Sequence, residues 1–354
     1  MTTTVKCLVW DLDNTLWQGT LLEDDEVVLS EEIRAVITEL DSRGILQAVA
    51  SKNDHEHAWG RLEKLGVSEY FVLAEIGWGP KSASVRTIAE RLNFAEGAVA
   101  FIDDQPAERA EVRYHLPDVR CFDAPDAARL TALPEFSPAR RTIDSGRRRE
   151  MYQANFRRDA ERAEFTGPDE DFLRSLDLEL QILRAGESEL SRVEELTVRT
   201  SQMNATGVPY SDETLRGFIA DPGHEVLVAT LQDRFGTHGA IGVALLETGQ
   251  AAWRLKLLAT SCRVVSFGVG TVILNWLADQ AASAAVHLLA DFRRTDRNRM
   301  MEIAYRFAGF DDADCACRRV TGAAGGDGVE LLHLEAERRE PPDTMRLLTP
   351  DLSA

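Results

Sequence analysis

The sequence predicts an α/β protein of two domains. In the first half, short apolar stretches typical of buried strands (residues 5–12, 45–50 and 98–102) alternate with amphipathic helical patterns. Strands that alternate with helices form a parallel, doubly wound sheet with helices on both faces. The second half follows another order: strand, two helices, three strands, helix, strand, helix and two strands. This order predicts a second α/β domain with a mixed sheet, and 354 residues are enough for both domains.

Local signals mark where the helices of the first half begin and end. Ser30 is a suitable N-cap for a helix over residues 31–44, with acidic residues in its first turn and a glycine at its end. A second helix covers residues 54–65. A third begins at Lys81 directly after Pro80, a residue suited to a helix start. Residues 71–74 form a further short strand candidate between these two helices.

Composition excludes several classes of protein. With 44% hydrophobic and 28% charged residues the chain is of ordinary globular composition. It contains no run of eighteen apolar residues, so we expect no membrane span, and its first residues lack the apolar region of a signal peptide. The net charge of −19 argues against nucleic acid as a partner. Three local arginine groups (140–141, 147–149 and 157–158) are either a docking surface for an acidic partner or the solvated face of a helix.

The five cysteines indicate a reducing compartment. They lie at positions 7, 121, 262, 315 and 317, an odd and unspaced set that does not suggest a disulfide framework. We therefore expect a cytoplasmic protein. Cys315 and Cys317 are interpreted as alternate positions of a strand over residues 313–320, because no second pair of cysteines completes a metal site.

The chemistry of the first half centres on residues 11–15, with the sequence DLDNT. Asp11 and Asp13 directly follow the first buried strand, where open α/β sheets place their active sites. One carboxylate can bind Mg²⁺ or attack as a nucleophile, and the second can act as a general acid or base. A calcium-binding loop is excluded, because Leu16 and Leu22 stand where that loop needs glycine and glutamate.

Polar side chains also follow the other two apolar strands. Ser51, Lys52 and Asn53 come after the second strand, and Asp103 and Asp104 come after the third. If the three strands are parallel neighbours, all these groups meet at one edge of the sheet. The acids would then form an oxygen-rich site suited to Mg²⁺, and a hydroxyl and a lysine would hold phosphate oxygens.

These four motifs resemble those of the haloacid dehalogenase superfamily of phosphoryl-transfer enzymes. The resemblance implies that Asp11 is a nucleophile that forms an aspartyl-phosphate and that Asp13 is the general acid/base. It implies that Asp103 and Asp104 bind Mg²⁺ with Asp11 and Asp13. It further implies that Ser51 and Lys81 bind the transferred phosphate, and the short segments between motifs leave no room for a large cap domain.

Longer matches resemble the FkbH-like proteins of polyketide pathways. In the first half they are DLDNTLWQG, the SKND of residues 51–54 and FIDDQPAERAEV. In the second half they are RTSQMNATG, DRFGTHGAIG, SCRVVSFGVG and RFAGF, and the element order there is similar to the GNAT acyltransferase fold. This fold implies a turn at Arg263, Gly268 and Gly270 that binds the pyrophosphate of coenzyme A or the arm of a phosphopantetheine. Ser266 departs from the usual glycine of this turn.

A second set of reactive residues is expected in this half. If the strands over residues 239–246 and 251–260 are antiparallel neighbours, His238 lies near Cys262, and Asp233 can orient the imidazole. The alternative for Cys262 is a buried, inert thiol. Thr200, Gln202 and Asn204 are either polar contacts to the substrate or a capping cluster between a helix and a loop.

We therefore expect a phosphatase domain (1–135), a linker with a bridging helix (136–176), an acyltransferase domain (177–340) and a tail (341–354). The resemblance implies an enzyme that takes 1,3-bisphosphoglycerate, removes phosphate with Mg²⁺ and passes a glyceryl group through a cysteine thioester to an acyl carrier protein. Two alternatives remain open: a phosphatase fused to an acetyl-CoA-dependent N-acetyltransferase, and a non-catalytic carrier-docking module.

Overall fold

The computed structural model describes residues 4–24, 26–138, 145–187, 189–199, 203–320 and 328–353. The chain divides into two compact units, Met1–Phe156 and Arg157–Ala354. The division falls within helix α5 (Arg148–Glu164). The boundary between the two units therefore lies inside an α-helix and not in a loop.

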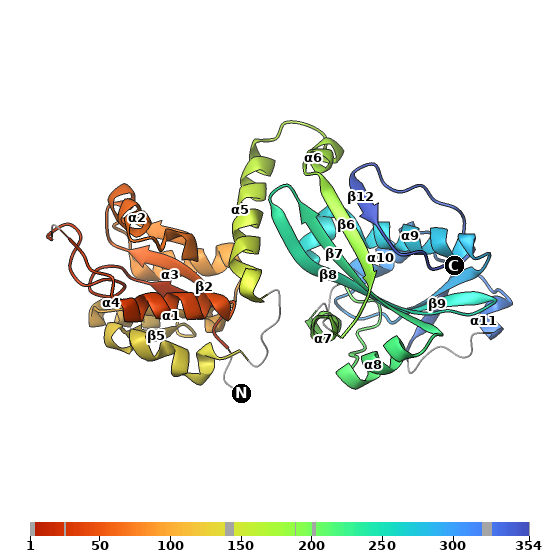
Figure 1. The fold of residues 1–354 in the computed structure, drawn as a ribbon, viewed down its shortest axis with the longest axis horizontal. Helices are drawn as coiled ribbons and strands as arrows, with labels where there is room; N and C mark the ends of the chain where they lie inside the picture. Colours follow the sequence, from red (N-terminus) through yellow and green to blue (C-terminus); the bar gives the residue numbers. More distant parts are fainter. Residues whose placement is uncertain are drawn as a thin grey trace. The chain divides into compact units, whose positions relative to one another are not determined.

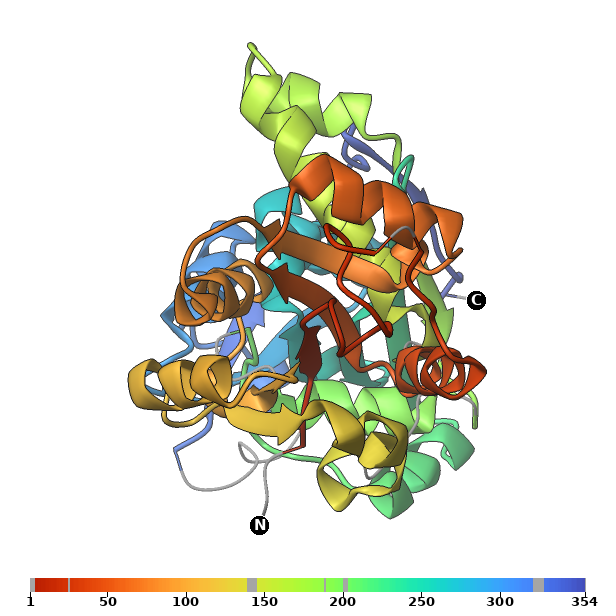
Figure 2. The same cartoon turned by 90° about the vertical axis from the view of Figure 1, so that its left-hand side faces the viewer.

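The N-terminal unit contains a five-stranded parallel sheet in the order β3-β2-β1-β4-β5. Its strands are β1 (Cys7–Trp10), β2 (Leu46–Ser51), β3 (Phe71–Ile76), β4 (Val99–Asp103) and β5 (Arg120–Asp123). The helices between them are α1 (Glu31–Ser42), α2 (His55–Lys64), α3 (Lys81–Leu92) and α4 (Pro106–His115). The expected doubly wound sheet is confirmed, and Figure 2 shows these strands between their helices.

The helices begin where the sequence signals place them. Ser30 accepts a hydrogen bond from the backbone amide of Ile33 at the start of α1, and Asp54 accepts one from His57 at the start of α2. These caps satisfy amides that the first helical turn leaves without a partner. Pro80 occupies the N-cap position of α3, so Lys81 is the first residue of that helix. The cap therefore fixes the place of Lys81 in the site described below.

Apolar side chains cover both faces of the parallel sheet. One cluster joins alternate strand residues such as Leu8 and Trp10 to α1 and α2. The other joins Cys7 and Val9 to α3 and α4. A strand buried on both faces reads as a continuous apolar run, which explains why β1, β2 and β4 could be recognised in the sequence.

The C-terminal unit contains a seven-stranded mixed sheet in the order β11-β10-β9-β8-β7-β6-β12. Figure 1 labels β6, β7, β8, β9 and β12 of this sheet. Its strands are β6 (Leu178–Arg184), β7 (His224–Asp233), β8 (Gly236–Glu247), β9 (Ala252–Thr260), β10 (His287–Phe292), β11 (Glu330–Leu334) and β12 (Met345–Leu348). β9 pairs with β10, and β6 with β12, in parallel; the other neighbours are antiparallel. The expected mixed sheet is confirmed.

Helices cover this sheet on both faces. The larger core includes Leu227 and Ala229 of β7 and the buried residues of α9 (Val269–Ser283) and α10 (Arg299–Phe307). The smaller core includes Val226 and Val228 with α7 (Leu190–Arg199) and α8 (Asp212–Ala220). The remaining helices are α6 (Asp169–Ser175) and α11 (Cys317–Val320). Within the described residues, no helix is both long enough and apolar enough to cross a membrane.

Two elements differ from the expectation. The strand expected over residues 313–320 is wrong, because residues 312–315 have no regular structure and Cys317–Val320 form α11. The region expected to be a tail contains β12, which pairs with β6 and places Met345 in the larger core. Both segments have only four regular residues, which is too short for a periodic apolar pattern to identify.

Candidate active site

The carboxyl ends of β1, β2 and β4 bring the expected acidic residues together. β1 lies between β2 and β4, with Trp10 opposite Val49 on one side and Ile102 on the other. Asp11 directly follows β1 and Asp103 ends β4, so both carboxylates lie at the same edge of the sheet. Both are buried, with exposed fractions of 5% and 1%.

Lys81 lies between these two carboxylates. Its ammonium donates hydrogen bonds to Asp11 Oδ1, to Asp103 Oδ2 at 3.0 Å and to the carbonyl of Ala50 at 2.7 Å. All three donors of the ammonium group are thus directed at the strand ends. The lysine is itself buried, and its charge offsets the repulsion between the two carboxylates.

Burial shifts the acidity of this group. Loss of water raises the pKa of Asp11 to about 6, although Lys81 opposes the shift and Asp103 adds to it. Burial followed by the negative charge of Asp103 also raises the pKa of Asp104. Holding these buried carboxylates close together costs free energy, because their negative charges repel each other. A further cation would reduce this cost.

The donor set fits a divalent ion. One carboxylate oxygen from each of Asp11, Asp103 and Asp104 lies within 4.8 Å of the others. Asp104 Oδ1 is buried and has no hydrogen-bond partner, while the Asp104 amide donates to Thr15 Oγ1 at 2.9 Å. Oxygen ligands of this kind suit Mg²⁺, and an orphaned carboxylate oxygen is a free ligand position.

Asp13 lies beside this group but is held differently. Asp13 Oδ1 accepts hydrogen bonds from the Trp17 indole at 2.8 Å and from the Leu21 amide at 3.0 Å. Asp13 Oδ2 accepts one from the Asn53 amide group at 3.0 Å. These three donors fix the orientation of a carboxylate that the structure leaves outside the three-acid cluster. The expectation that Asp13 binds metal stays a prediction.

The remaining residues expected to bind phosphate have distinct surroundings. Ser51 is buried at the end of β2. Lys52 is half-exposed and forms a 2.6 Å ion pair with Glu108 of α4. Sequence reasoning did not single out Thr15, Trp17 and Glu108 as site residues. Their only signal was proximity to the motifs, since Thr15 and Trp17 lie within six residues of Asp11.

A second cluster lies where β7 turns into β8. His238 Nε2 lies 3.1 Å from Asp233 Oδ2, and Arg158 Nε lies 2.6 Å from the same oxygen. The amides of Phe235 and Gly236 donate to Asp233 Oδ1 at 2.9 and 3.1 Å. The Asp233 side chain is fully buried. Arg158 was not assigned to this site from the sequence, because it lies 75 residues before Asp233.

These contacts control the charge of His238. Burial lowers the pKa of its imidazole; Asp233 partly opposes this effect, and Arg158 and Arg263 add to it. The pKa of Asp233 lies far below its usual value because His238 and Arg158 hydrogen bond to the carboxylate and outweigh its burial. A neutral imidazole with Nε2–H directed at a carboxylate keeps Nδ1 as the basic nitrogen.

Cys262 begins the short 3₁₀ helix η6 (Cys262–Phe267), which directly follows β9. β8 and β9 are antiparallel neighbours, as expected, and Ser261 donates its amide to the carbonyl of Ile241 at 2.7 Å. The backbone of Cys262 therefore lies close to Ile241, three residues after His238 in β8. Its side chain lies outside the described part of the structure, so its approach to His238 stays a prediction.

The turn that follows leads into α9. Gly268 adopts φ = +69° and ends η6, and Val269 begins the helix. A Cβ atom at Gly268 or Gly270 would meet nothing within 4 Å. Open space beside the first turn of a 15-residue helix, whose amides lack intrahelical acceptors, suits a phosphate group.

The polar residues expected after α7 are only partly described. Thr200 and Gln202 lie outside the described residues. Asn204 is buried, donates to the carbonyl of Thr197 at 3.0 Å and accepts from the amides of Thr206 and Gly207. These contacts are those of the capping alternative, in which the side chain joins a helix end to a loop. Asn298, which donates to the Asn204 carbonyl at 3.0 Å, extends that network.

The arginine groups expected to form a docking surface are partly used inside the protein. Arg149 pairs with Asp41 at 3.0 Å and donates to the carbonyl of Glu69, and Arg148 donates to the carbonyl of Gly44. Arg158 is buried against Asp233. Arg147 and Arg157 are exposed, and residues 140–141 lie outside the described residues. A continuous exposed patch over Arg147–Arg149 is therefore not what the structure shows.

Comparison with known families assigns the first unit to a class. Residues 18–111 match the family model of haloacid dehalogenase-like hydrolases. This match includes Ser51, Lys81, Asp103 and Asp104, and it begins after Asp11 and Asp13. Residues 18–111 thus belong to a haloacid dehalogenase-like hydrolase domain. The Mg²⁺ cofactor expected from the sequence agrees with that family and with the donor set described above.

Several solved structures are similar to a part of the chain. The N-terminal part of a Bacteroides fragilis protein, containing a phosphatase domain complexed with Mg, is 27% identical over 43% of this chain, with a TM-score of 0.33. This chain spans 40% of that chain. A hydrolase of the same superfamily from Ehrlichia chaffeensis is 12% identical over 37% of this chain and 98% of its own, with a TM-score of 0.31.

The third of these structures is an acetyltransferase. The ribosomal-protein-S18-alanine N-acetyltransferase of Escherichia coli is 15% identical over 46% of this chain and 96% of its own, with a TM-score of 0.33. The neighbours therefore include both haloacid dehalogenase hydrolases and GNAT-type acetyltransferases. None of the curated proteins searched matched the chain.

Proposed function

We propose that the N-terminal unit is a Mg²⁺-dependent phosphatase that works through a covalent aspartyl-phosphate. The observation that carries this proposal is the position of Lys81, buried between Asp11 and Asp103 beside the orphaned oxygen of Asp104. A buried cation and an unsatisfied carboxylate oxygen at one sheet edge are suited to hold a phosphoryl group and its metal ion.

In the proposed reaction, Asp11 attacks the phosphorus atom and displaces the alcohol or acyl oxygen of the substrate. Asp13 gives a proton to that leaving oxygen, then removes a proton from the water that hydrolyses the aspartyl-phosphate. Asn53, Trp17 and the Leu21 amide hold Asp13 in one orientation for both steps. Lys81 and Ser51 bind phosphoryl oxygens. Mg²⁺ bound by Asp11, Asp103 and Asp104 would supply positive charge against the developing negative charge.

We further propose that the C-terminal unit transfers an acyl group between thiols. His238, kept neutral by burial and oriented by Asp233, would remove the proton of the Cys262 thiol through Nδ1. The thiolate would attack the acyl carbonyl and release the leaving group, forming a thioester. A phosphopantetheine thiol would then attack that thioester and restore Cys262. Gly268 and Gly270 would accept the phosphate of the arm beside α9.

The FkbH-like resemblance supplies the proposed substrates. They are 1,3-bisphosphoglycerate as the glyceryl donor and an acyl carrier protein as the acceptor, in polyketide biosynthesis. A mixed anhydride of this kind is an activated acyl donor, and the phosphate ester that remains is a substrate for the first unit. One chain would then contain both the thiol that takes the acyl group and the carboxylates that remove phosphate.

Intact-mass spectrometry after incubation with 1,3-bisphosphoglycerate and Mg²⁺ tests both parts. We expect a glyceryl adduct that moves to a phosphopantetheinylated carrier protein. Cys262→Ala should abolish the adduct, whereas Cys121→Ala, which removes a partly exposed thiol elsewhere, should retain it. Phosphate release should disappear in Asp11→Asn and persist in Asp118→Asn, an exposed control. An adduct formed instead from acetyl-CoA, without any carrier, would favour the N-acetyltransferase alternative.

A further inference from the structure

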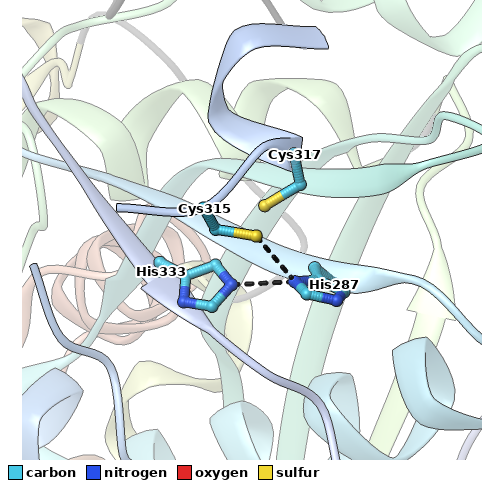
Figure 3. Close-up of side chains that lie close together, drawn as sticks. All are labelled: His287, Cys315, Cys317 and His333. Carbon is cyan, nitrogen blue, oxygen red and sulfur yellow. Dashed lines mark hydrogen bonds between the residues drawn. The ribbon is translucent and has the colours of Figure 1, made fainter. Parts of the chain in front are cut away.

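Four side chains of residue types that bind metals in other proteins lie together in the C-terminal unit, and none of them belongs to the sites described above. They are His287, Cys315, Cys317 and His333, and one ligand atom of each lies within 4.8 Å of the others. Figure 3 shows the four side chains pointing toward one another. The sequence-based interpretation of Cys315 and Cys317 as alternate strand positions is therefore wrong, because two histidines supply the second pair.

The sheet register brings the histidines together. β10 and β11 are antiparallel, with Leu289 of β10 opposite His333 of β11. His287 is two residues before Leu289, so it lies diagonally across from His333 on the same face of the sheet. His287 Nδ1 lies 2.8 Å from His333 Nε2. Two residues 46 apart in the sequence thus contribute to one site.

The cysteines come from the segment that crosses this face. Cys315 Sγ lies 3.5 Å from His287 Nδ1, and Cys317 is the first residue of α11. Arg318 holds the segment in place by donating to the carbonyls of Asp312 and Ala313 at 3.0 Å and to that of Leu331 in β11. The apolar cluster here is small, with Ala252, Leu289, Cys317 and Leu331 as its buried members. Few apolar contacts therefore fasten this segment to the sheet.

The distances are close to those around a tetrahedral zinc ion. Zinc bonds of about 2.3 Å to sulfur and about 2.0–2.1 Å to nitrogen place neighbouring ligand atoms about 3.3–3.8 Å apart. The sulfur–nitrogen distance of 3.5 Å falls in this range. The two ring nitrogens would need to separate by about 0.5 Å, a movement that side-chain rotation provides.

The outer contact of His333 follows a pattern common at zinc sites. While Nε2 faces the cluster, Nδ1 lies 3.6 Å from Asp311 Oδ1. Asp311 is fixed there by two backbone hydrogen bonds of 2.8 Å with His333. Histidines that bind metals usually direct their second ring nitrogen at a carboxylate or a carbonyl, which fixes the tautomer and raises the basicity of the ligand.

We propose that His287, Cys315, Cys317 and His333 bind one Zn²⁺ ion that fastens residues 311–317 and α11 to the edge of the C-terminal sheet. Two thiolates and two imidazoles are the donor set of structural zinc sites, and four protein ligands leave no open position for substrate. Zinc replaces the two thiol protons and the hydrogen bond between the rings.

Metal analysis of the full-length protein, purified without chelator or histidine tag, tests the proposal. We expect about one zinc per chain, reduced to below a tenth in Cys315→Ser/Cys317→Ser and retained in Cys121→Ser. Because the double variant can also lose its fold, exchange of the wild-type metal for Co²⁺ is the second measurement. Cobalt bound by two thiolates gives intense visible bands of tetrahedral Co²⁺ with a thiolate-to-metal charge-transfer band.

A substitution of Asp311, the carboxylate beside His333, tests the proposal without removing a zinc ligand. Asp311→Asn should weaken zinc binding about 10- to 100-fold, measured by competition with a chromogenic chelator. Asp312→Asn, which changes a neighbouring carboxylate that pairs with Arg306, should leave the affinity unchanged. The proposal is overturned if the wild type binds no zinc, if cobalt gives only the pale spectrum of octahedral coordination, or if the cysteine double variant keeps its full zinc content.

Discussion

The Nε2 atom of His238 lies 3.1 Å from the Oδ2 atom of Asp233, and both side chains are almost completely buried. The same carboxylate oxygen accepts a hydrogen bond from Arg158 at 2.6 Å. A carboxylate shared by an imidazole and a guanidinium orients the ring without requiring it to be charged, because Arg158 already balances Asp233. The arrangement thus favours a neutral, oriented base.

The first prediction concerns the pH dependence of stability. Since burial lowers the pKa of His238, the unfolded chain takes up this proton at a higher pH than the folded chain does. Stability is therefore greatest above about pH 6.5 and is lost as the pH falls toward the lower pKa of the folded state. Thermal unfolding of the full chain between pH 7.5 and 5 should show this decline. His238→Gln should flatten it, and His57→Gln, a change on the exposed surface of α2, should not. An unchanged slope in His238→Gln would contradict the assignment.

The second prediction concerns Lys81. Lys81→Met leaves the carboxylates of Asp11 and Asp103 buried without their cation, which should lower the free energy of unfolding by about 3–5 kcal/mol. Mg²⁺ should restore more stability to this variant than to the wild type, because the ion then supplies positive charge that Lys81 no longer provides. Urea unfolding with and without Mg²⁺ measures both effects. Lys52→Met breaks a half-exposed ion pair and should cost less than about 1 kcal/mol; equal losses in the two variants would refute the prediction.

The third prediction separates the two glycines before α9. Gly268→Ala places a side chain at φ = +69° and should destabilise the protein by about 1 kcal/mol. Gly270→Ala has helical backbone and free space for its methyl group, so stability should be unchanged or slightly higher. If the pantetheine phosphate approaches this turn, Gly270→Ala should nevertheless raise the KM for the carrier protein. Carrier-dependent transfer and thermal unfolding, measured on both variants, distinguish a glycine needed for the backbone conformation from one needed for binding the arm. An unaltered KM would place the arm elsewhere.

The fourth prediction concerns docking of an acidic carrier protein. Arg147→Glu reverses an exposed charge and should slow carrier loading at low salt while leaving unfolding within about 0.5 kcal/mol of the wild type. Arg149→Glu breaks the ion pair with Asp41 and the hydrogen bond to Glu69, so it should instead destabilise the N-terminal unit by about 2 kcal/mol. Stopped-flow loading across a salt series, alongside urea unfolding, tests the difference. Loading by Arg147→Glu at the wild-type rate would exclude this residue from the docking surface.

The fifth prediction concerns Asn204. Its side chain joins the end of α7 to the loop at Thr206 and Gly207. Asn204→Ala therefore removes the partner of the buried Thr197 carbonyl, of the buried Thr206 amide and of the part-buried Gly207 amide. We expect a loss of about 1–3 kcal/mol in stability. If capping is its whole role, the KM values of the folded variant should match those of the wild type. A large increase in KM without a loss of stability would point instead to substrate contact.

Most of the fold of the first unit could be predicted from the sequence, because the signals that determine it are local. Ser30, Asp54 and Pro80 act on amides within four residues, and strands buried on both faces show as continuous apolar runs. The convergence of Asp11 and Asp103 needed only the assumption of parallel neighbours. Arg158 and Asp233 meet through tertiary packing, and His287 and His333 meet through a strand register. The sequence around these residues does not indicate either contact.

The two edges of the C-terminal sheet are formed by its last two strands, β11 and β12, which flank a sheet that begins at Leu178. During synthesis, one edge of β6 stays unpaired until β12 has been made, about 160 residues later. The sheet therefore lacks its two edge strands until nearly all of this unit has left the ribosome. The N-terminal unit has its five strands by Asp123 and can fold much earlier. Until Met345–Leu348 have been synthesised, the chain should therefore be a folded N-terminal unit followed by a sheet with unpaired edges that is prone to aggregation.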